Sequence, residues 1–466
     1  MGSFIQYDLA TNFDEELIDF IIENDKHKQI KSVFGKLKTD ITGGGRAAFL
    51  LPDIDMSALK NYIEKCSNAG IEFNYLINSI SLNDSMINPV RSTEFMAFID
   101  ELYGIGVRSF TVNSPLLCKY LKGKYSDVRI TVGLYAYPTS IQMIQYWVNN
   151  GADEITLDHA FNRDIPLLRT ALKTFKDTDI KLRLIANNFC LHGCVSKIDH
   201  ACHLGCASTD RYKGSSFVDY HLLNCVYNKV SHPAAMLSSD WIRPEDVKLY
   251  KDLMDETGNY NLTLKLVERT RTTDFLKRVT KAYLDESFDG NLLDIMNWSK
   301  LNEMAFAQNK QAQAPMAAAV SAASGAPNGV QGGPPAGMPA GGPPAGIQGG
   351  PPAGVQGGPG AGGSPYRPEV MMKYGRCMRY PDIVIDNRKL DGFMSGFFKM
   401  GTCSTKLCGA SILPEDSKNP ALCTYCKTWA DKAISSDPQE TGQWLAMASD
   451  VLKAIEDRSI FSGVQG

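Results

Sequence analysis

The chain has 466 residues, of which 44% are hydrophobic and 21% charged, and its net charge at pH 7 is −3. This length allows two or more domains with substantial cores, and the composition is typical of a globular protein. The charge balance gives no support to a protein that coats nucleic acid or binds a membrane surface.

No apolar run reaches the roughly 18 residues of a membrane span, and acids stand where a signal peptide would need its apolar core. We therefore expect a cytoplasmic protein with no membrane partner. In that compartment the twelve cysteines are better interpreted as thiols or metal ligands than as disulfides. Cys66 and Cys118 stand alone on apolar, helix-like stretches and are predicted to pack in the core.

Residues 1–29 are predicted to form an N-terminal helical extension, and residues 30–300 alternate strand-like runs with amphipathic helical patterns. Two of these helical patterns end at Gly70 and Gly106, which suit left-handed caps. Eight such units favour an α/β fold, a closed TIM-like (β/α)8 barrel, over an open doubly wound sheet. The predicted strands are 31–37, 71–78, 107–113, 128–134, 153–158, 181–186, 234–240 and 260–267.

A group of cysteines begins four residues after the sixth predicted strand, in a loop that would lie on the active-site face of such a barrel. Four thiolates brought together repel one another and need a cation or a cluster between them. The group consists of Cys190, Cys194, Cys202, Cys206 and Cys225.

Soft thiolate ligands suit both zinc and an iron–sulfur cluster. The gaps between these cysteines are three, seven, three and 18 residues, whereas zinc ribbons usually show two-residue gaps, so the spacing favours iron–sulfur. Packed thiols without a metal are the alternative. His192, His200 and His203 could add ligands, but a hydrogen-bonding role is the commoner one for each.

Residues 301–365 start with a helical pattern and continue as a Gly/Pro/Ala-rich tract in which "GGPPAG" occurs three times. This segment has too few apolar side chains to form a core, so we expect a flexible, disordered linker.

Residues 366–466 are predicted to form a small cysteine-rich, metal-binding module that ends in a helix. Four cysteines there have a spacing suited to one metal site, either zinc or a second 4Fe–4S cluster, whose binding energy would stabilise the fold. Cys377 is left open as a substitute ligand. The four cysteines are Cys403, Cys408, Cys423 and Cys426.

Polar residues follow several predicted strands and are candidates for a site at the barrel mouth. Arg46 follows three glycines, which let the backbone approach an anionic ligand. For each of the others, capping a helix or bracing a loop is an equal alternative. They are Asn78, Asn113, Asp158, Asn187, Asn188, Glu268, Arg269 and Arg271.

Several stretches resemble a branch of the collagenase-like peptidase family U-32. "DWIRPEDVKLY" (240–250) and "DGNLLD" (289–294) are the most specific, and the likeness covers roughly residues 30–300 and 370–435. Others are "FGKLKTDITGGGRAAFLLPD", "GIEFNYLINSISLND", "GADEITLDHAFNRD", "IANNFCLHGC", "LDGFMSGFF" and "CTYCKTWADKAI".

The resemblance implies a TIM-like barrel, and in several family members a 4Fe–4S cluster held by barrel cysteines. Some members support oxygen-independent hydroxylation of RNA bases or quinone precursors. Cys190, Cys194 and Cys225 match this branch best, and Cys202 and Cys206 compete for the fourth ligand position. The first gap is three residues here, where the best-known members have six, so the cluster carries over better than any substrate.

Three functions follow from these observations. The first is an iron–sulfur-dependent oxidoreductase, performing a hydroxylation-like reaction at the barrel mouth on an unknown small molecule, peptide or RNA, with an electron donor as partner. The second is a peptidase with Cys194 as nucleophile and His192 or His200 as base, although neither H-E-x-x-H nor G-x-S-x-G is present. The third is a non-catalytic, zinc-binding scaffold protein.

Overall fold

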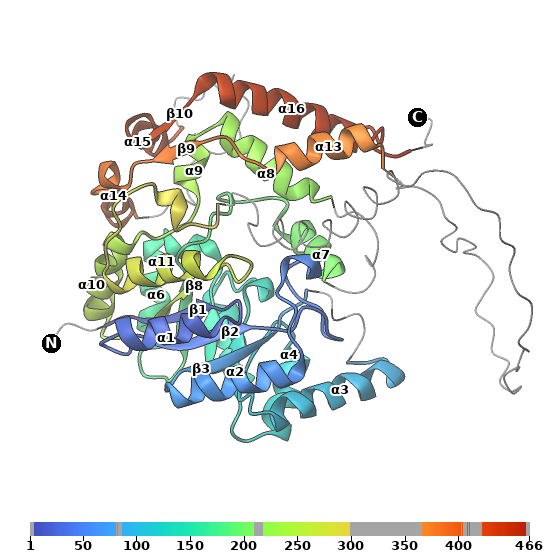
Figure 1. The fold of residues 1–466 in the computed structure, drawn as a ribbon. Coiled ribbons are helices and arrows are strands. Elements are labelled where there is room, and N and C mark those ends of the chain that lie inside the picture. Colours follow the sequence, from blue (N-terminus) through green and yellow to red (C-terminus); the bar gives the residue numbers. More distant parts are fainter. Residues whose placement is uncertain are drawn as a thin grey trace, which may run out of the picture.

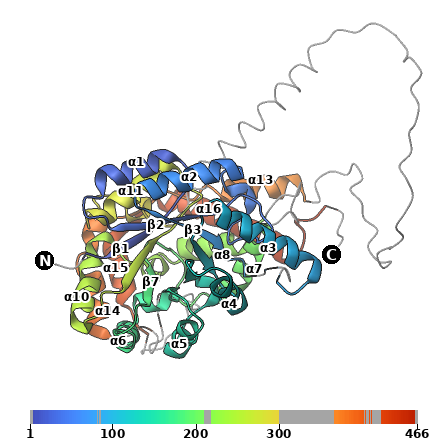
Figure 2. The same cartoon turned by 90° about the horizontal axis from the view of Figure 1, so that it is seen from below.

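The protein forms a closed barrel of eight parallel strands, seen here in a computed structural model that describes residues 4–80, 82, 86–208, 218–298, 366–401, 403, 408, 410 and 422–462. Each strand pairs with the next one along the chain, and β8 pairs with β1. Helices surround the strands, as Figure 2 shows. The predicted TIM-like barrel is confirmed. The strands are β1 (Gln6–Ala10), β2 (Ile30–Gly35), β3 (Glu72–Ile77), β4 (Ser109–Val112), β5 (Arg129–Val132), β6 (Glu154–Thr156), β7 (Lys181–Ile185) and β8 (Leu262–Leu266).

Most of the helices around the barrel begin at polar caps, and three of them also have a proline in their first turn. Asp55 accepts a hydrogen bond from the Ala58 amide at the start of α2, and Ser114 caps α4 ahead of Pro115. The predicted glycine turns are also present, with φ of 72° at Gly70 and 104° at Gly106. The helices of the barrel region are α1 (Glu15–Asn24), α2 (Met56–Asn68), α3 (Pro89–Gly104), α4 (Pro115–Lys124), α5 (Ile141–Asn149), α6 (Ile165–Thr174), α7 (Lys197–Ala207), α8 (Tyr220–Ser231), α9 (Ala234–Ser238), α10 (Val247–Thr257) and α11 (Thr273–Leu284).

Short 3-10 turns join several of these elements. They are η1 (Ala48–Leu50), η2 (Leu134–Ala136), η3 (His159–Asn162), η5 (Pro244–Asp246) and η6 (Leu292–Asp294). None of the helices in the described ranges is long and apolar enough to cross a membrane.

Two predictions need correction: the N-terminal extension and the seventh strand. Residues 1–29 are not a helical extension, because β1 lies between β2 and β8 and completes the barrel. Its charged residue Asp8 is buried and hydrogen-bonds Ser32, so the strand does not show a purely apolar pattern. Conversely, the run at 234–240 is buried but forms the short helix α9 after Pro233.

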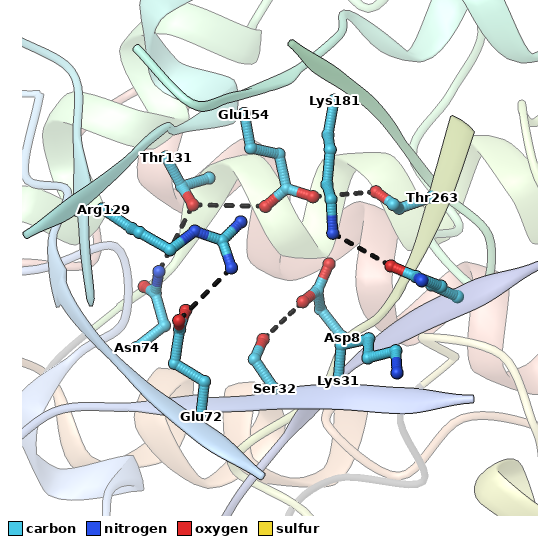
Figure 3. Close-up of a pocket in the computed structure, with 11 residues that line it drawn as sticks. Asp8, Lys31, Ser32, Glu72, Asn74, Arg129, Thr131, Glu154, Lys181 and Thr263 are labelled. Carbon is cyan, nitrogen blue, oxygen red and sulfur yellow. Dashed lines mark hydrogen bonds and ion pairs between the residues drawn. The ribbon is translucent and has the colours of Figure 1, made fainter. Parts of the chain in front are cut away.

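The amino-terminal end of the barrel is closed by charged side chains that pair with one another. Arg183 Nη1 lies 2.8 Å from Glu154 and 3.3 Å from Asp8, and all three are buried. Arg129 reaches Glu72 at 3.3 Å nearer the rim. Figure 3 shows Asp8, Glu154, Arg129 and Glu72 among the side chains that line this end. We expect these ion pairs to contribute to the stability of the barrel, because the active sites of such barrels lie at the other end.

The C-terminal region, described from residue 366 onward, packs on the barrel. Its α16 lies against α8 and its α15 against α9, as Figure 1 shows along the top of the molecule. Its elements are α13 (Pro368–Cys377), β9 (Ile383–Ile385), η7 (Asn387–Leu390), α14 (Phe393–Met400), α15 (Tyr425–Ala433), β10 (Ile434–Ser436) and α16 (Pro438–Glu456).

This region is not a separate module joined to the barrel by a tether alone. The Trp241 and Phe393 rings are 5.4 Å apart, and Arg243 Nη1 donates to the Asn387 carbonyl oxygen at 2.9 Å. The apolar side chains of both parts belong to one continuous core. The predicted C-terminal helix is confirmed as α16. The predicted helical start and linker at 301–365 lie outside the described residues.

Candidate active site at the carboxyl end of the barrel

The loop after β2 brings two charged residues to the carboxyl end of the barrel. Lys36 is buried, and its Nζ lies 2.8 Å from the Asp40 carboxylate, which also accepts a hydrogen bond from the Tyr75 hydroxyl at 2.5 Å. Burial lowers the pKa of Lys36, and Asp40 opposes that shift. A Cβ on Gly45 would lie 2.7 Å from the Tyr135 ring, so only glycine lets this loop pass so close.

Arg46 and Glu268 form an ion pair across the barrel mouth, at 2.9 Å between Nη2 and Oε1. Burial lowers the pKa of Arg46, but Glu268, Tyr135 and Cys190 outweigh it and raise the pKa overall. Glu268 has φ of 100°, which is strained for a residue other than glycine. Such strain is typical of functional sites, where the surrounding structure holds a side chain in place.

Cys190, His159 and Asn188 form a cluster at the ends of β6 and β7. The Asn188 side-chain nitrogen lies 2.5 Å from His159 Nε2, and Cys190 Sγ lies 3.5 Å from Asn188 Oδ1. Burial by the surrounding mouth raises the pKa of Cys190, but its hydrogen bond with His159, the charge of His159 and that of Lys229 bring it down to about 6. The Cys190 side chain still reaches solvent in this concave mouth.

Two further cysteines lie beside Cys190. Cys194 and Cys225 each feel the charge of Cys190, and Lys229 is close enough to act on all three thiols. Burial raises the pKa of Cys194 and that of Cys225. Lys229 is itself buried and donates to the Phe189 carbonyl oxygen. Three of the five predicted cysteines are therefore near enough to Lys229 for its charge to act on their ionisation.

Cys202 and Cys206 lie one turn apart on α7, as predicted, and are half-buried. Cys202 lies near the Tyr137 ring, whose hydroxyl donates to the Lys197 carbonyl oxygen.

The three histidines near these cysteines have hydrogen-bonding roles. His192 Nδ1 lies 3.0 Å from Asp240, His200 Nε2 lies 3.1 Å from Asp219, and His203 bonds the Val218 carbonyl oxygen. His192 and His200 are thus held by carboxylates, and no hydrogen bond or ion pair between described residues joins either one to Cys194. The histidine that meets a cysteine is His159, which the sequence analysis missed.

Some of the predicted polar residues lie at the barrel mouth, and others brace loops or cap helices. Asn187 braces the loop after β8, because its side chain bonds the Val267 amide at 2.7 Å and the Ile295 carbonyl oxygen at 3.2 Å. Asp158 caps η3 and pairs with Lys197 at 2.9 Å. Bracing roles apply to both.

Three other candidates lie around the mouth or behind it. Asn113 donates to the Asn78 carbonyl oxygen at 2.7 Å, and the side-chain oxygen of each asparagine is buried without a hydrogen-bond partner. Arg271 donates to the Trp298 carbonyl oxygen and stacks over the Phe275 ring, away from the cysteines.

The four C-terminal cysteines line one hollow. Phe397, Met400 and Tyr425 complete its wall, and Cys408 and Cys423 form a β-bridge. Burial raises the pKa of Cys403 to about 11 and that of Cys426 to about 12, against the opposing charge of Arg163. The predicted grouping of Cys403, Cys408, Cys423 and Cys426 in space is therefore present.

Across the described ranges, no three Cys, His, Asp or Glu side chains are arranged so that they could hold a metal ion. The two cysteine groups supply thiols in the right neighbourhoods, but not at metal-ligand distances. The zinc and iron–sulfur interpretations thus stay predictions.

Comparison with known proteins finds similarity to proteins that match part of this chain. No protein-family model matches it. A protein from Methanocaldococcus jannaschii named an uncharacterized protease is 26% identical over 259 residues, which is 55% of this chain and 73% of that relative. In these comparisons the chain resembles the U32 peptidases. The resemblance predicted from its motifs is confirmed.

The U32 likeness also appears among solved structures. A U32 peptidase, covering 57% of this chain and 94% of its own, has a TM-score of 0.41 and 15% sequence identity. An alpha-amylase from Lactobacillus plantarum covers 40% of this chain and 62% of its own, with a TM-score of 0.27 and 9% identity.

Proposed function

We propose that this U32 relative is an iron–sulfur-dependent enzyme whose substrate binds at the carboxyl end of the barrel. The observation that carries the proposal is the convergence of Cys190, Cys194 and Cys225 around Lys229. Thiolates are the ligands that such clusters need, and a buried ammonium offsets part of their negative charge.

The donor set fits a 4Fe–4S cluster in residue type. Cys190, Cys194 and Cys225 would supply three ligands, and Cys206 or Cys202 on α7 the fourth. The bound cluster would supply one-electron chemistry to a redox modification, and a hydroxylation-like reaction is the form we favour. Hydroxylation oxidises the substrate by two electrons, so this reaction would need a co-reactant that supplies the oxygen atom and takes up those electrons. The electron donor stays a predicted partner that would re-reduce the cluster. The same thiol chemistry makes the C-terminal hollow a second site, for zinc or for a second cluster.

The remaining residues of the mouth would position the substrate. Arg46 is held by Glu268 at 2.9 Å, so its guanidinium presents fixed donors to the mouth. His159 lies against Cys190 and is held by Asn188 at 2.5 Å, which places one proton-carrying group beside the thiols.

A second candidate, a cysteine hydrolase, is favoured by the same cluster of Cys190, His159 and Asn188. Nucleophilic cysteines are commonly paired with a histidine that a third group orients. The two candidate functions exclude each other at Cys190, because a cysteine that ligates a cluster is not free to attack a peptide bond.

Metal content separates these functions. We would purify the chain anaerobically, together with Cys190→Ala, Cys194→Ala and Cys225→Ala. Cys118→Ala is the matched control, since Cys118 is a buried core thiol on α4 and is not one of the mouth cysteines. The proposal expects each of the three mouth variants to lose iron and sulfide, while the control keeps the wild-type content.

Equal metal content in mouth variants and control would reject the barrel cluster. Cleavage of a denatured protein substrate by metal-free wild type, lost in Cys190→Ala, would support the hydrolase. Stoichiometric zinc without sulfide would support the zinc-binding scaffold protein.

A further inference from the structure

Arg269 is a buried guanidinium that stands three residues after β8. Arg269 is 5% exposed, and its Nη1 is buried with no hydrogen-bond partner among the described residues. Among the described residues, no carboxylate forms an ion pair with it. Because an unpaired buried charge is costly, such a group in a native protein calls for a ligand.

The carboxylates nearest to Arg269 are already engaged. Asp40 is bonded to Lys36 at 2.8 Å, and Glu268 is bonded to Arg46 at 2.9 Å. Burial, then the charge of Arg46, lowers the pKa of Arg269 to about 10. Positive charge therefore exceeds negative charge at this point of the mouth.

A second cation that forms no ion pair with described residues lies on β8 itself. Lys265 is buried with its Nζ 3.9 Å above the Phe34 ring, and it forms no ion pair in the ranges described. Burial lowers the pKa of Lys265, as does the charge of the nearby Arg183, and Arg269 adds to this effect.

Tyr135 completes a set of donors around Arg269. Its hydroxyl lies within hydrogen-bonding reach of Arg46, and both Arg46 and Arg269 act on its ionisation. Burial raises the pKa of Tyr135, which keeps the phenol protonated and able to donate. The loop at Gly45 lies against the same ring.

We infer that Arg269, Arg46 and Tyr135 bind an oxyanion, the carboxylate or phosphate group of the substrate. A planar guanidinium matches both groups with two parallel hydrogen bonds. Arg46 and Tyr135 also lie close to Cys190, so an anion held here would anchor the substrate beside the thiols. The inference rests on the proposed function only in taking this mouth as the substrate site.

The test uses full-length chain and two simple probes, inorganic phosphate and malonate, titrated by calorimetry with sodium chloride at matched ionic strength as the blank. Wild type should bind at least one of the two saturably. Arg269→Met should weaken that binding at least about thirtyfold, as expected for removal of one partner of a buried charge pair. Arg269→Lys should retain part of the affinity.

Arg129→Gln is the matched control, because this arginine lies at the opposite end of the barrel and pairs with Glu72. It should bind the probes as wild type does. Phosphate binding alone would assign the site to a phosphoryl group, and malonate binding alone to a carboxylate.

The inference is overturned if neither probe binds wild type, or if Arg269→Met binds as tightly as wild type. Should the Met variant not fold, an unchanged affinity in Arg269→Lys and in Arg46→Met would overturn it equally. Iron and sulfide are measured on the same samples. Anion binding in a chain without iron would reject the cluster and retain the oxyanion site. Iron and sulfide in a chain that binds neither anion would retain the cluster and reject the oxyanion site.

Discussion

The two ends of the barrel differ in how their buried charges are paired. At the amino-terminal end, Arg183 contacts both Glu154 and Asp8, so its buried charge is balanced. At the carboxyl end, Arg269 is equally buried but lacks a carboxylate partner among the described residues, and Glu268 beside it has strained backbone.

This difference separates stability from function. A fold gains nothing from an unpaired buried guanidinium or from a residue with φ of 100°. Both features fit a site that is completed by its ligand, and proteins commonly accept a loss of stability at such sites. The paired end, by contrast, is expected to hold the barrel closed.

The largest effect should come from breaking the paired end. Replacing Arg183 by Met leaves Glu154 and Asp8 buried without their cation. The free energy of unfolding should fall by about 3–5 kcal/mol, measured by denaturant titration. A loss below about 1 kcal/mol would mean that this network does not hold the barrel closed.

A smaller loss is expected where the C-terminal region meets the barrel. The Asn387 side chain donates to Glu245 at 2.9 Å and to the Phe288 carbonyl oxygen at 2.7 Å. Asn387→Ala should cost about 2 kcal/mol, because buried acceptors lose their donor. Unfolding should stay a single transition, since one core spans both parts. The exposed Asn149→Ala serves as control and should leave stability nearly unchanged. Two separate transitions in wild type would instead support the prediction that residues 366–466 form an independent module.

At the carboxyl end, removing a buried charge should increase the stability of the protein. Arg269→Met removes a buried charge that has no carboxylate partner in the described ranges, so the chain without ligand should become more stable by about 1 kcal/mol. The midpoint of thermal unfolding checks this directly. A destabilisation as large as that of Arg183→Met would remove the contrast between the two ends.

The smallest effect concerns Asp219, which caps α8 and bonds His200 at 3.1 Å. Burial raises the pKa of Asp219, but His200 outweighs it and the pKa lies below its usual value. The ionised form therefore stabilises the fold above about pH 4, and this contribution is lost as the pH falls through the lowered pKa.

Asp219→Asn keeps a capping oxygen and removes the charge. It should cost about 1 kcal/mol or less at pH 7, and the difference from wild type should shrink below about pH 4. Unfolding midpoints at a series of pH values measure it. A constant difference at every pH would assign the effect to the cap and not to the charge.

Much of the fold could be predicted from sequence because parallel strands with both faces buried are written as apolar runs between helical patterns. The pattern failed at β1, where the buried Asp8 finds its partner on β7, a pairing that only the closed barrel creates. It also failed at residues 234–240, because a short buried helix is as apolar as a strand.

The site was predictable in part. Arg46 and Arg269 were found from their places after strands, but the missing partner of Arg269 is a property of three-dimensional packing. His159 could have been found, since it directly follows a predicted strand whose neighbour leads to Cys190. The contact of the C-terminal region with the barrel was hidden by the tract at 301–365, although the apolar run at Phe393–Phe398 needed a surface to cover it.

The central claim is that the carboxyl end is a cluster-binding active site, and the content of iron, acid-labile sulfide and zinc in anaerobically purified wild-type chain tests it most directly. We predict iron and sulfide in equal amounts, with a broad visible absorption that bleaches on reduction. Protein that contains neither iron nor sulfide, or zinc alone, would contradict the claim.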